Sequence, residues 1–377
     1  MTRRHIRSHT ALRGIAALLV VLYHLQFGFS FYFGWEKATP FFTKGYLWVD
    51  LFFILSGFVI AYSTQAESRQ KFDWPDIRRF WRARFARIYP LHLFCLALML
   101  VTQASVWLLG KLVGKSYSDP DLWSAGSIAN FIEQLLLLNA WGLTGRVGWN
   151  IPSWSISAEA FAYFLFPGIA LFLAKGGCRS AVTLLAGSGT FYIYVGLTGG
   201  DLDIVKGLAV ARCLAGFSLG MILYRHRNAY ERLPTGVLSA LQVVGLAPVL
   251  ATLLFGLNDV FAIPGFYLLV AATWPDRGSL PKLLSFRIFQ WLGNISYSVY
   301  LTHVVLLGPW RLLVPPVFER LGFDGAGVRS VLIIGGIALI LIASTATFLF
   351  IEQPARDAIN RKFSRKRNRT EAASAPI

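Results

Sequence analysis

Ten long apolar stretches follow one another along the chain, separated by short segments that carry most of the charged residues. A helix needs about 20 mostly apolar residues to cross a hydrocarbon core of about 30 Å. The stretches cover residues 11–33, 46–64, 88–110, 156–174, 180–198, 207–224, 235–256, 259–275, 288–310 and 329–350. The amphipathic piece "IANFIEQLLLLNAW" predicts one further short helix. This pattern predicts an all-α, polytopic integral membrane protein with about ten transmembrane helices.

The composition also indicates a membrane protein. Of the 377 residues, 55% are hydrophobic and only 15% are charged, which is too apolar for a soluble domain of this length. A net charge of +17 could indicate nucleic-acid binding, but the Lys and Arg residues lie in short clusters between apolar stretches. We therefore expect a lipid bilayer as partner and no nucleic acid. Because the cysteines lack the spacing of metal ligands, we expect packing roles, no disulfide framework and no metal site for Cys95, Cys178 and Cys213.

The distribution of Lys and Arg predicts the topology. With the N-terminus in the cytoplasm, 26 of the 36 basic residues fall on the cytoplasmic side, 9 fall outside, and Arg212 lies within a helix. Cytoplasmic loops are enriched in Lys and Arg, so both termini are expected to be cytoplasmic. The last stretch ends in "FLFIEQPAR", interpreted as a helix stop with Glu352 paired to Arg356. We expect a membrane-embedded domain over residues 1–356 and a basic cytoplasmic tail over residues 357–377.

The first apolar stretch carries an arginine and a histidine in "RGIAALLVVLYHL". The eleven steps from Arg13 to His24 cover about 16 Å and close to three turns of a helix, so both side chains share a face and His24 lies near mid-membrane. A histidine there can be a packing residue, and an arginine can anchor the helix at the boundary. Titratable groups inside a membrane are costly and commonly functional, which makes His24 a candidate catalytic residue.

Polar residues also enter the second and third stretches. In "WVDLFFILSGF", Asp50, Ser56 and Gly57 either mark an interface and a close helix contact or contribute to a site. In "RRFWRARFARIYP", Arg84 and Arg87 lie three residues apart and so share a helical face. The preference for basic cytoplasmic loops explains the charge of this segment but not the spacing. Since arginine forks bind phosphate oxygens, we expect this pair to bind a phosphorylated ligand from the cytoplasm.

Two later stretches begin with polar residues. The segment "NIPSWSISAEAFAYFLFP" contains Ser157 and Glu159, which are either helix-start residues or site residues. The segment "GNISYSVYLTH" contains Asn294, Tyr297 and His303. Hydroxyl and amide groups often join membrane helices, so a packing role for this second set stays open.

These segments, in this order, resemble the integral-membrane acyltransferase family 3, whose bacterial members O-acylate lipopolysaccharide O-antigen, exopolysaccharide, Nod factor, peptidoglycan and some macrolides. The family's arginine, ten intervening residues and histidine are matched by Arg13 and His24. Its patterns "VDxFFxLSGF", "RxxRIxP", "WSLSxExxFY" and "SYxxYLxH" appear as "VDLFFILSGF", "RFARIYP", "WSISAEAFAYF" and "SYSVYLTH". The resemblance covers nearly the whole chain, although the usual aromatic pair is spread over Phe161 and Tyr163. Many members carry an extracytoplasmic domain after the last helix, so this chain resembles a stand-alone form.

The resemblance implies a multi-pass enzyme of the bacterial cytoplasmic (inner) membrane. It would move an acyl group, most simply acetyl, from cytoplasmic acyl-CoA to a hydroxyl of a glycan, a lipid-linked saccharide or a glycolipid. Acyl-CoA would be a co-substrate, with no permanently bound cofactor and no metal. Arg13, Arg84 and Arg87 would bind the donor.

On this hypothesis His24 is the general base that takes the proton from the attacking hydroxyl. Glu159 or Asp50 would orient His24. The candidates for oxyanion or substrate contacts are Ser157, Asn294, Tyr297 and His303. Direct transfer and an acyl-histidine intermediate are both compatible with these residues. The alternative is a multi-pass transporter or flippase for a lipid-linked or anionic sugar, although paired half-repeats with broken helices are not evident.

Overall fold

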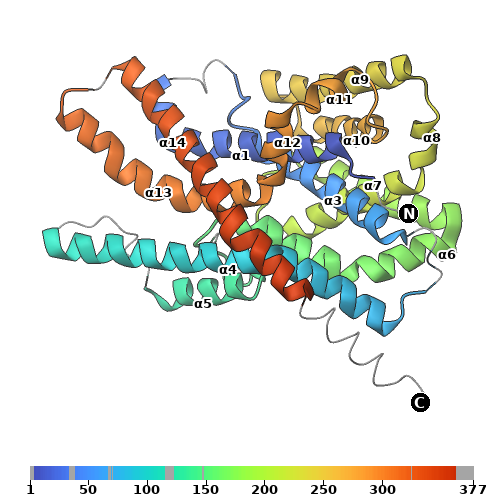
Figure 1. Ribbon diagram of the computed structural model, residues 1–377, viewed down its shortest axis with the longest axis horizontal. Helices are drawn as coiled ribbons and strands as arrows, with labels where there is room; N and C mark the ends of the chain where they lie inside the picture. Colours follow the sequence, from blue (N-terminus) through green and yellow to red (C-terminus); the bar gives the residue numbers. More distant parts are fainter. Residues whose placement is uncertain are drawn as a thin grey trace.

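The computed structural model of the protein describes residues 4–33, 39–66, 69, 71–114, 123–146, 148–323 and 325–361. These residues form helices and turns, and none of them lies in a strand (Figure 1). The first half of the chain contains α1 (Arg7–Phe33), η1 (Gly45–Leu47), α3 (Trp48–Thr64), α4 (Trp74–Val113), α5 (Ala125–Leu135), η3 (Asn139–Trp141) and α6 (Ser153–Leu197). The second half contains α7 (Ala209–Arg225), α8 (Arg227–Glu231), α9 (Thr235–Phe255), η4 (Asp259–Phe261), α10 (Ala262–Thr273), α11 (Ser279–Leu284), α12 (Arg287–Asn294), α13 (Ser296–Arg320), α14 (Ala326–Thr347) and the π-helix η5 (Phe348–Glu352).

All ten apolar stretches of the sequence fall on helices. Seven helical segments of the described chain are long and apolar enough to cross a membrane, and they contain α1, α3, α4, α6, α9, α13 and α14. The 45-residue α6 covers two predicted stretches, because its backbone breaks at Gly177 (φ 59°, ψ −133°). α7 and α10 are shorter, with 17 and 12 residues. The all-α membrane fold is confirmed, while the count of ten crossings and the side of each terminus stay predictions.

The cysteines follow the sequence interpretation in part. All three are free thiols, and Cys95 and Cys213 are buried as expected of packing residues. Cys178 is exposed beside the break in α6. The packing role predicted for Cys178 is therefore wrong.

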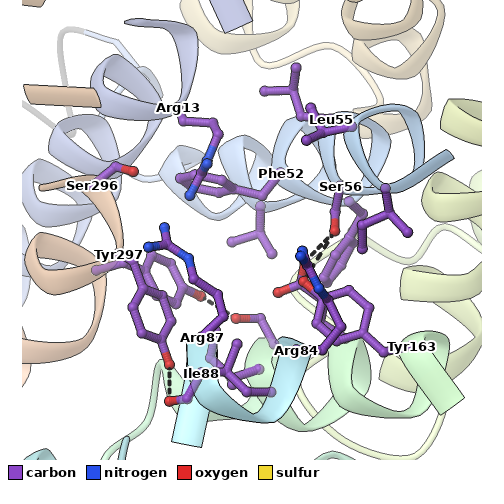
Figure 2. Close-up of a pocket in the computed structure, with 18 residues that line it drawn as sticks. Arg13, Phe52, Leu55, Ser56, Arg84, Arg87, Ile88, Tyr163, Ser296 and Tyr297 are labelled. Carbon is purple, nitrogen blue, oxygen red and sulfur yellow. Dashed lines mark hydrogen bonds between the residues drawn. The ribbon is translucent and has the colours of Figure 1, made fainter. Parts of the chain in front are cut away.

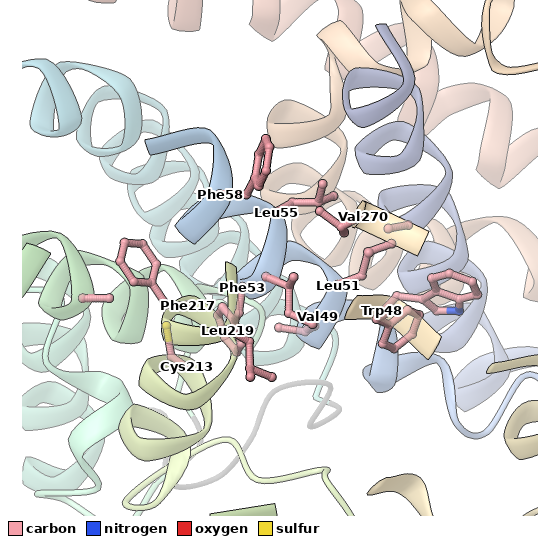
Figure 3. Close-up of a cluster of buried hydrophobic side chains, with 14 of the residues drawn as sticks. Trp48, Val49, Leu51, Phe53, Leu55, Phe58, Cys213, Phe217, Leu219 and Val270 are labelled. Atoms are coloured by element: carbon pink, nitrogen blue, oxygen red, sulfur yellow. The ribbon is translucent and has the colours of Figure 1, made fainter. Parts of the chain in front are cut away.

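α3 lies at the centre of the largest apolar core and packs against α7 through glycines. A Cβ on Gly57 would lie 2.0 Å from the carbonyl oxygen of Phe217, and one on Gly220 would lie 2.0 Å from that of Ile54. No side chain fits at such distances, so glycine allows the two backbones to approach closely. Figure 3 shows side chains from α3, α7 and α10 filling the space beside this contact, among them Phe53, Phe58, Cys213, Phe217 and Val270.

α1 begins at a cap that is supplied from far along the chain. The backbone N–H groups of Arg7 and Ser8 donate to the Asp276 carboxylate at 3.1 and 2.9 Å, and Arg4 forms an ion pair with it at 3.2 Å. The first N–H groups of a helix lack intrahelical partners, and a carboxylate satisfies them. Burial raises the pKa of Asp276, but the hydrogen bonds from Ser8, Arg7 and Arg4 outweigh it, so the pKa lies below its ordinary value.

The end of the last long helix differs from the predicted helix stop. After η5 the chain continues as a helix over residues 353–361. The buried carboxylate of Glu352 accepts from Arg87 and from Ser298, which replaces the predicted pair with Arg356. That predicted pair is therefore wrong. Residues 362–377 lie outside the described residues, and the predicted boundary between domain and tail stays a prediction.

Candidate functional site

A cavity of about 110 Å³ lies where α1, α3, α4, α6 and α13 meet (Figure 2). Its polar lining residues are Arg13, Ser56, Arg84, Arg87, Ser155, Glu159, Tyr163, Ser296, Tyr297 and Tyr300. Because these residues come from five helices spread over most of the chain, only the folded protein brings them together. Five of the predicted site residues line this cavity, namely Arg13, Arg84, Arg87, Glu159 and Tyr297. We call it the arginine cavity.

Three arginines from two helices reach into the arginine cavity. Arg13 enters from α1, and Arg84 and Arg87 enter from α4 on the opposite wall (Figure 2). Within the described part of the chain, Arg13 forms no hydrogen bond or ion pair. The buried Nε of Arg84 likewise has no hydrogen-bond partner there. Guanidinium groups with unsatisfied donors are suited to an anion with several oxygen atoms, such as a phosphate.

Arg87 is held more firmly than the other two arginines. It donates to the buried carboxylate of Glu352, whose other oxygen accepts from Ser298 at 2.8 Å. Its guanidinium group also lies over the ring of Tyr297, 5.4 Å from the centroid. The hydroxyl of Tyr297 donates to the carbonyl of Ile88, the residue next to Arg87 (Figure 2). These contacts fix the direction in which Arg87 enters the cavity.

Glu159 supplies a negative charge to the wall beside Arg84. Ser56 of α3 donates to the Glu159 carboxylate and lies 3.3 Å from the hydroxyl of Tyr163, one turn further along α6 (Figure 2). Ser56 therefore ties α3 to α6 at the cavity. The predicted role of Glu159 in orienting His24 stays a prediction.

His24 and His303 lie side by side, with ring centroids 4.8 Å apart. Tyr300 connects them to the arginine cavity, because it lines that cavity and lies 6.1 Å from His303. Nδ1 of His24 is 3.0 Å from the carbonyl oxygen of Val20, and Nδ1 of His303 is 3.1 Å from that of Val299. A carbonyl oxygen only accepts, so each Nδ1 carries the proton and each neutral ring keeps a lone pair on Nε2. For the fully buried His303, Nε2 has no hydrogen-bond partner within the described chain.

Asp50 has a different partner from the one predicted. Arg212 of α7 donates to both Asp50 carboxylate oxygens, at 3.1 and 2.6 Å, and to the carbonyl of Tyr46 at 3.0 Å. Both charged side chains are fully buried. The sequence signal was Arg212 itself, because a charge inside an apolar stretch requires a counter-charge. The pair joins α3 to α7, and the role of Asp50 in orienting His24 stays a prediction.

Ser157 and Asn294 also lie elsewhere. The Ser157 hydroxyl donates to the carbonyl of Leu137 at 2.6 Å and accepts from the N–H of Ala140 at 3.2 Å. It thereby holds a turn in which Leu137 has a positive φ of 57°. Asn294 is exposed at the last position of α12. Neither residue lines the arginine cavity, and the oxyanion or substrate contacts expected of them stay predictions.

Sequence reasoning missed several residues of the site. Ser155 and Tyr300, whose hydroxyl groups lie 2.7 Å apart, join α6 to α13 in the cavity wall. Both stand inside segments that the motifs had already marked, so a closer reading of those segments could have included them. Glu352 was singled out only as part of a helix stop, and its partner was missed because Arg87 lies 265 positions away.

Comparisons with known proteins identify the family of this chain. The family model described as "Acyltransferase domain", of acyltransferase family 3, matches residues 7–351. "Acyltransferase MdmB" of Streptomyces mycarofaciens is 28% identical over 80% of this chain and 78% of its own length. "Peptidoglycan O-acetyltransferase OatA" of Listeria monocytogenes is 26% identical over 94% of this chain but 56% of its own length.

No solved structure matches the chain. The family match covers most of the sequence, and it includes every helix that lines the arginine cavity. The chain belongs to acyltransferase family 3 and is a multi-pass membrane acyltransferase.

Proposed function

We propose that this protein transfers an acyl group, most simply acetyl, from acyl-CoA to a hydroxyl of a glycan, a lipid-linked saccharide or a glycolipid. The observation that carries the proposal is the convergence of Arg13, Arg84 and Arg87 on one cavity near a histidine pair. Coenzyme A combines several phosphate groups with a long flexible arm that ends in the thioester. The relatives' names give acyl transfer and O-acetylation as the chemistry that this donor would serve.

The arginine cavity would hold the phosphate end of the donor. Arg13 and Arg84 offer donor groups that the described protein leaves unused, and Arg87 is already directed into the cavity by Glu352. Charge-assisted hydrogen bonds from arginine forks to phosphate are short and roughly twice as strong as neutral ones. The carboxylate of Glu159 would lower the net positive charge of the arginine cavity. Coenzyme A would then bind less tightly and could leave after the reaction.

His24 would act as the general base. With Nδ1–H donated to the Val20 carbonyl, Nε2 carries the lone pair that would take the proton of an acceptor hydroxyl. The alcohol oxygen forms the new ester bond as it attacks the thioester carbonyl, and the carbon–sulfur bond breaks. The proton on His24 then passes to the leaving thiolate, which returns the imidazole to its neutral state. His303, beside His24, would stabilise this arrangement through its own Nε2 or by contact with the acceptor.

The membrane orientation follows from the same residues. The arginine cavity lies on the first turns of α1 and on the part of α4 that contains the basic segment "RRFWRARFARIYP". Basic segments favour the cytoplasm, where acyl-CoA is made. We therefore assign the arginine cavity to the cytoplasmic half of the bacterial cytoplasmic membrane.

The test is a donor assay on purified protein in detergent. Acetyl-CoA is added with a set of candidate glycans, and released thiol is followed with a colorimetric reagent while mass spectrometry detects acetylated glycan. We expect thiol release that depends on the glycan and matches ester formed. Acetylation that proceeds from another acyl donor, with no use of acetyl-CoA, would overturn the proposed donor.

A further inference from the structure

A second cavity, of about 690 Å³, lies between the second half of α4, the segment before α6 and the proline-containing half of α13. It has about six times the volume of the arginine cavity. Figure 1 shows these parts of α4 and α13 diverging from one another. We call this cavity the outer groove, and its characteristic residues are Thr102, Gln103, Trp149, Gly308, Arg311 and Glu319.

Two helices, α4 and α13, line both cavities. α4 contributes Arg84 and Arg87 to the arginine cavity and, further along, Thr102 and Gln103 to the outer groove. Since α4 enters the membrane from the basic segment, the outer groove lies toward the opposite face. The groove therefore offers a route to the site from the side that is remote from the donor.

α13 places the histidine pair between the two cavities. Tyr297 and Tyr300 line the arginine cavity, whereas Val304 and Gly308 line the outer groove. His303 stands between these two sets and contacts His24. At 1.5 Å per residue, the two linings are separated by about 6 Å along the helix axis, from Tyr300 to Val304.

The chemistry of the outer groove differs from that of the arginine cavity. Its lining combines the indole ring of Trp149, the amide of Gln103, one cation from Arg311 and one anion from Glu319, together with aliphatic and proline side chains. Because these two charges are opposite, the lining of the outer groove carries no net charge and does not favour an anionic ligand. An aromatic face with amide and charged hydrogen-bonding groups suits a saccharide, whose C–H faces pack on rings and whose hydroxyl groups need both donors and acceptors.

We infer that the outer groove binds the saccharide part of the acceptor and presents its hydroxyl group to His24 and His303. This inference rests on the proposed function, because it requires a donor in the arginine cavity. A groove of this volume lies within the range of about 300–1,000 Å³ that holds ligands of drug size. It therefore accommodates a sugar unit while the remainder of the acceptor extends out of the membrane domain.

Gly308 allows a direct test, because a Cβ at this position would enter open space inside the groove. Gly308→Ala, Gly308→Leu and Gly308→Phe fill the groove in steps. Gly187 is a matched control on α6, since it is exposed, has equally open space around a Cβ and lies outside both cavities. Gly187→Phe adds the same side chain without narrowing the groove.

Two measurements are made on each variant. The affinity for coenzyme A is measured on purified protein, and transfer of radiolabelled acetyl from acetyl-CoA to saccharide is measured in membranes of the source strain deleted for the wild-type gene. We expect transfer to fall with side-chain size, by tenfold or more for Gly308→Phe, while coenzyme A affinity stays within twofold. Gly187→Phe should match the wild type in both measurements, and Gly308→Leu serves if the larger replacement fails to fold.

The outcomes separate this inference from the proposed function. Wild-type transfer by a folded Gly308→Phe protein would overturn the groove as the acceptor site and would indicate that it holds only lipid. Loss of coenzyme A affinity together with transfer would assign the groove to the donor instead. If the wild-type membranes transfer nothing from acetyl-CoA, the proposed function itself fails, and the inference falls with it.

Discussion

At the scale of single residues, the three arginines of the site differ in what holds them. Arg87 is fixed by Glu352 and by the ring of Tyr297, whereas Arg13 and Arg84 keep donor groups unused within the described chain. The affinity for the donor should therefore depend most on the arginines without protein partners. A firmly paired arginine gains less from a phosphate, because the phosphate must compete with the carboxylate.

Arg84→Lys tests the geometry of phosphate binding. Lysine keeps the charge but loses the planar fork, so coenzyme A affinity should fall roughly tenfold, equivalent to about 1.4 kcal/mol. Calorimetric titration of the purified protein measures the effect. Arg78→Ala is the control, because Arg78 is exposed on the same helix and does not line the cavity. Equal affinities in the two variants would show that α4 is basic for topology alone.

Asp50→Asn tests the structural role assigned to the Asp50–Arg212 pair. The fully buried Arg212 would lose its counter-charge, and removing one partner of a buried pair costs about 3–5 kcal/mol. Thermal unfolding in detergent should therefore shift to lower temperature, while folded protein retains coenzyme A binding. Replacing both residues, as Asp50→Leu with Arg212→Met, should recover part of the loss. A variant of normal stability that has lost acyl transfer would instead support the catalytic role predicted from the sequence.

At the scale of elements, α1 is the helix whose placement matters most, because it carries both Arg13 and His24. Its start is fixed by Asp276 in the turn between α10 and α11. A shift of α1 along its axis would move both residues by the same amount relative to α4 and α13. The cap therefore supports the site from a distance.

Asp276→Asn should lower the stability of the folded protein by about 1 kcal/mol, as for other helix caps. The pKa of Asp276 is lowered in the folded state, so its contribution is complete above the unfolded value of about 3.9 and is lost as the pH falls through the folded value. Thermal unfolding of both proteins between pH 7 and pH 3 checks this. The gap between them should narrow at the acidic end, and a constant gap would contradict the assigned role.

The elements were largely predictable from the sequence, whereas their partners were not. All ten stretches identified by apolar length lie on helices, but apolar length did not predict the first part of α4, α8 or α11. It also did not predict that two stretches join end to end at Gly177 as α6. Arg13, Arg84, Arg87 and Glu159 were found because motif spacing marked them. The partner of Asp50 was missed because ion pairs between distant helices depend on packing angles that local patterns do not contain. For the same reason Ser157, chosen for its position in a motif, proved to secure a turn.

At the scale of the whole molecule, the two cavities and the histidine pair define a direction across the protein. The arginine cavity lies beside the basic segment in the first half of α4, and the outer groove lies further along the same helix. A donor and an acceptor could therefore approach the histidines from opposite faces of the membrane. This arrangement requires that the basic segments lie on the cytoplasmic side of the membrane.

The membrane topology can be tested by labelling cysteines. The native Cys178 is exposed, so the cytoplasmic side needs no introduced cysteine. It lies at the break in α6, in a segment assigned to the cytoplasm, while Cys95 and Cys213 are buried. A membrane-impermeant maleimide should therefore label intact cells only after permeabilisation. Gly200→Cys, made with Cys178→Ser, places a reporter at an exposed position on the opposite side, where a Cβ makes only ordinary van der Waals contacts, and it should be labelled without permeabilisation. The reverse pattern would exclude donor entry from the cytoplasm.

The central claim is that His24 accepts the proton of the acceptor hydroxyl, and the most direct test is the acetyl-CoA-dependent transfer rate of His24→Gln. Glutamine keeps a polar side chain that can hydrogen-bond, but it cannot take up a proton near neutral pH. We predict that this variant accumulates and binds coenzyme A like the wild type, while its transfer rate falls by about 10²–10⁴-fold, as for loss of a general base. Transfer at close to the wild-type rate would contradict the account.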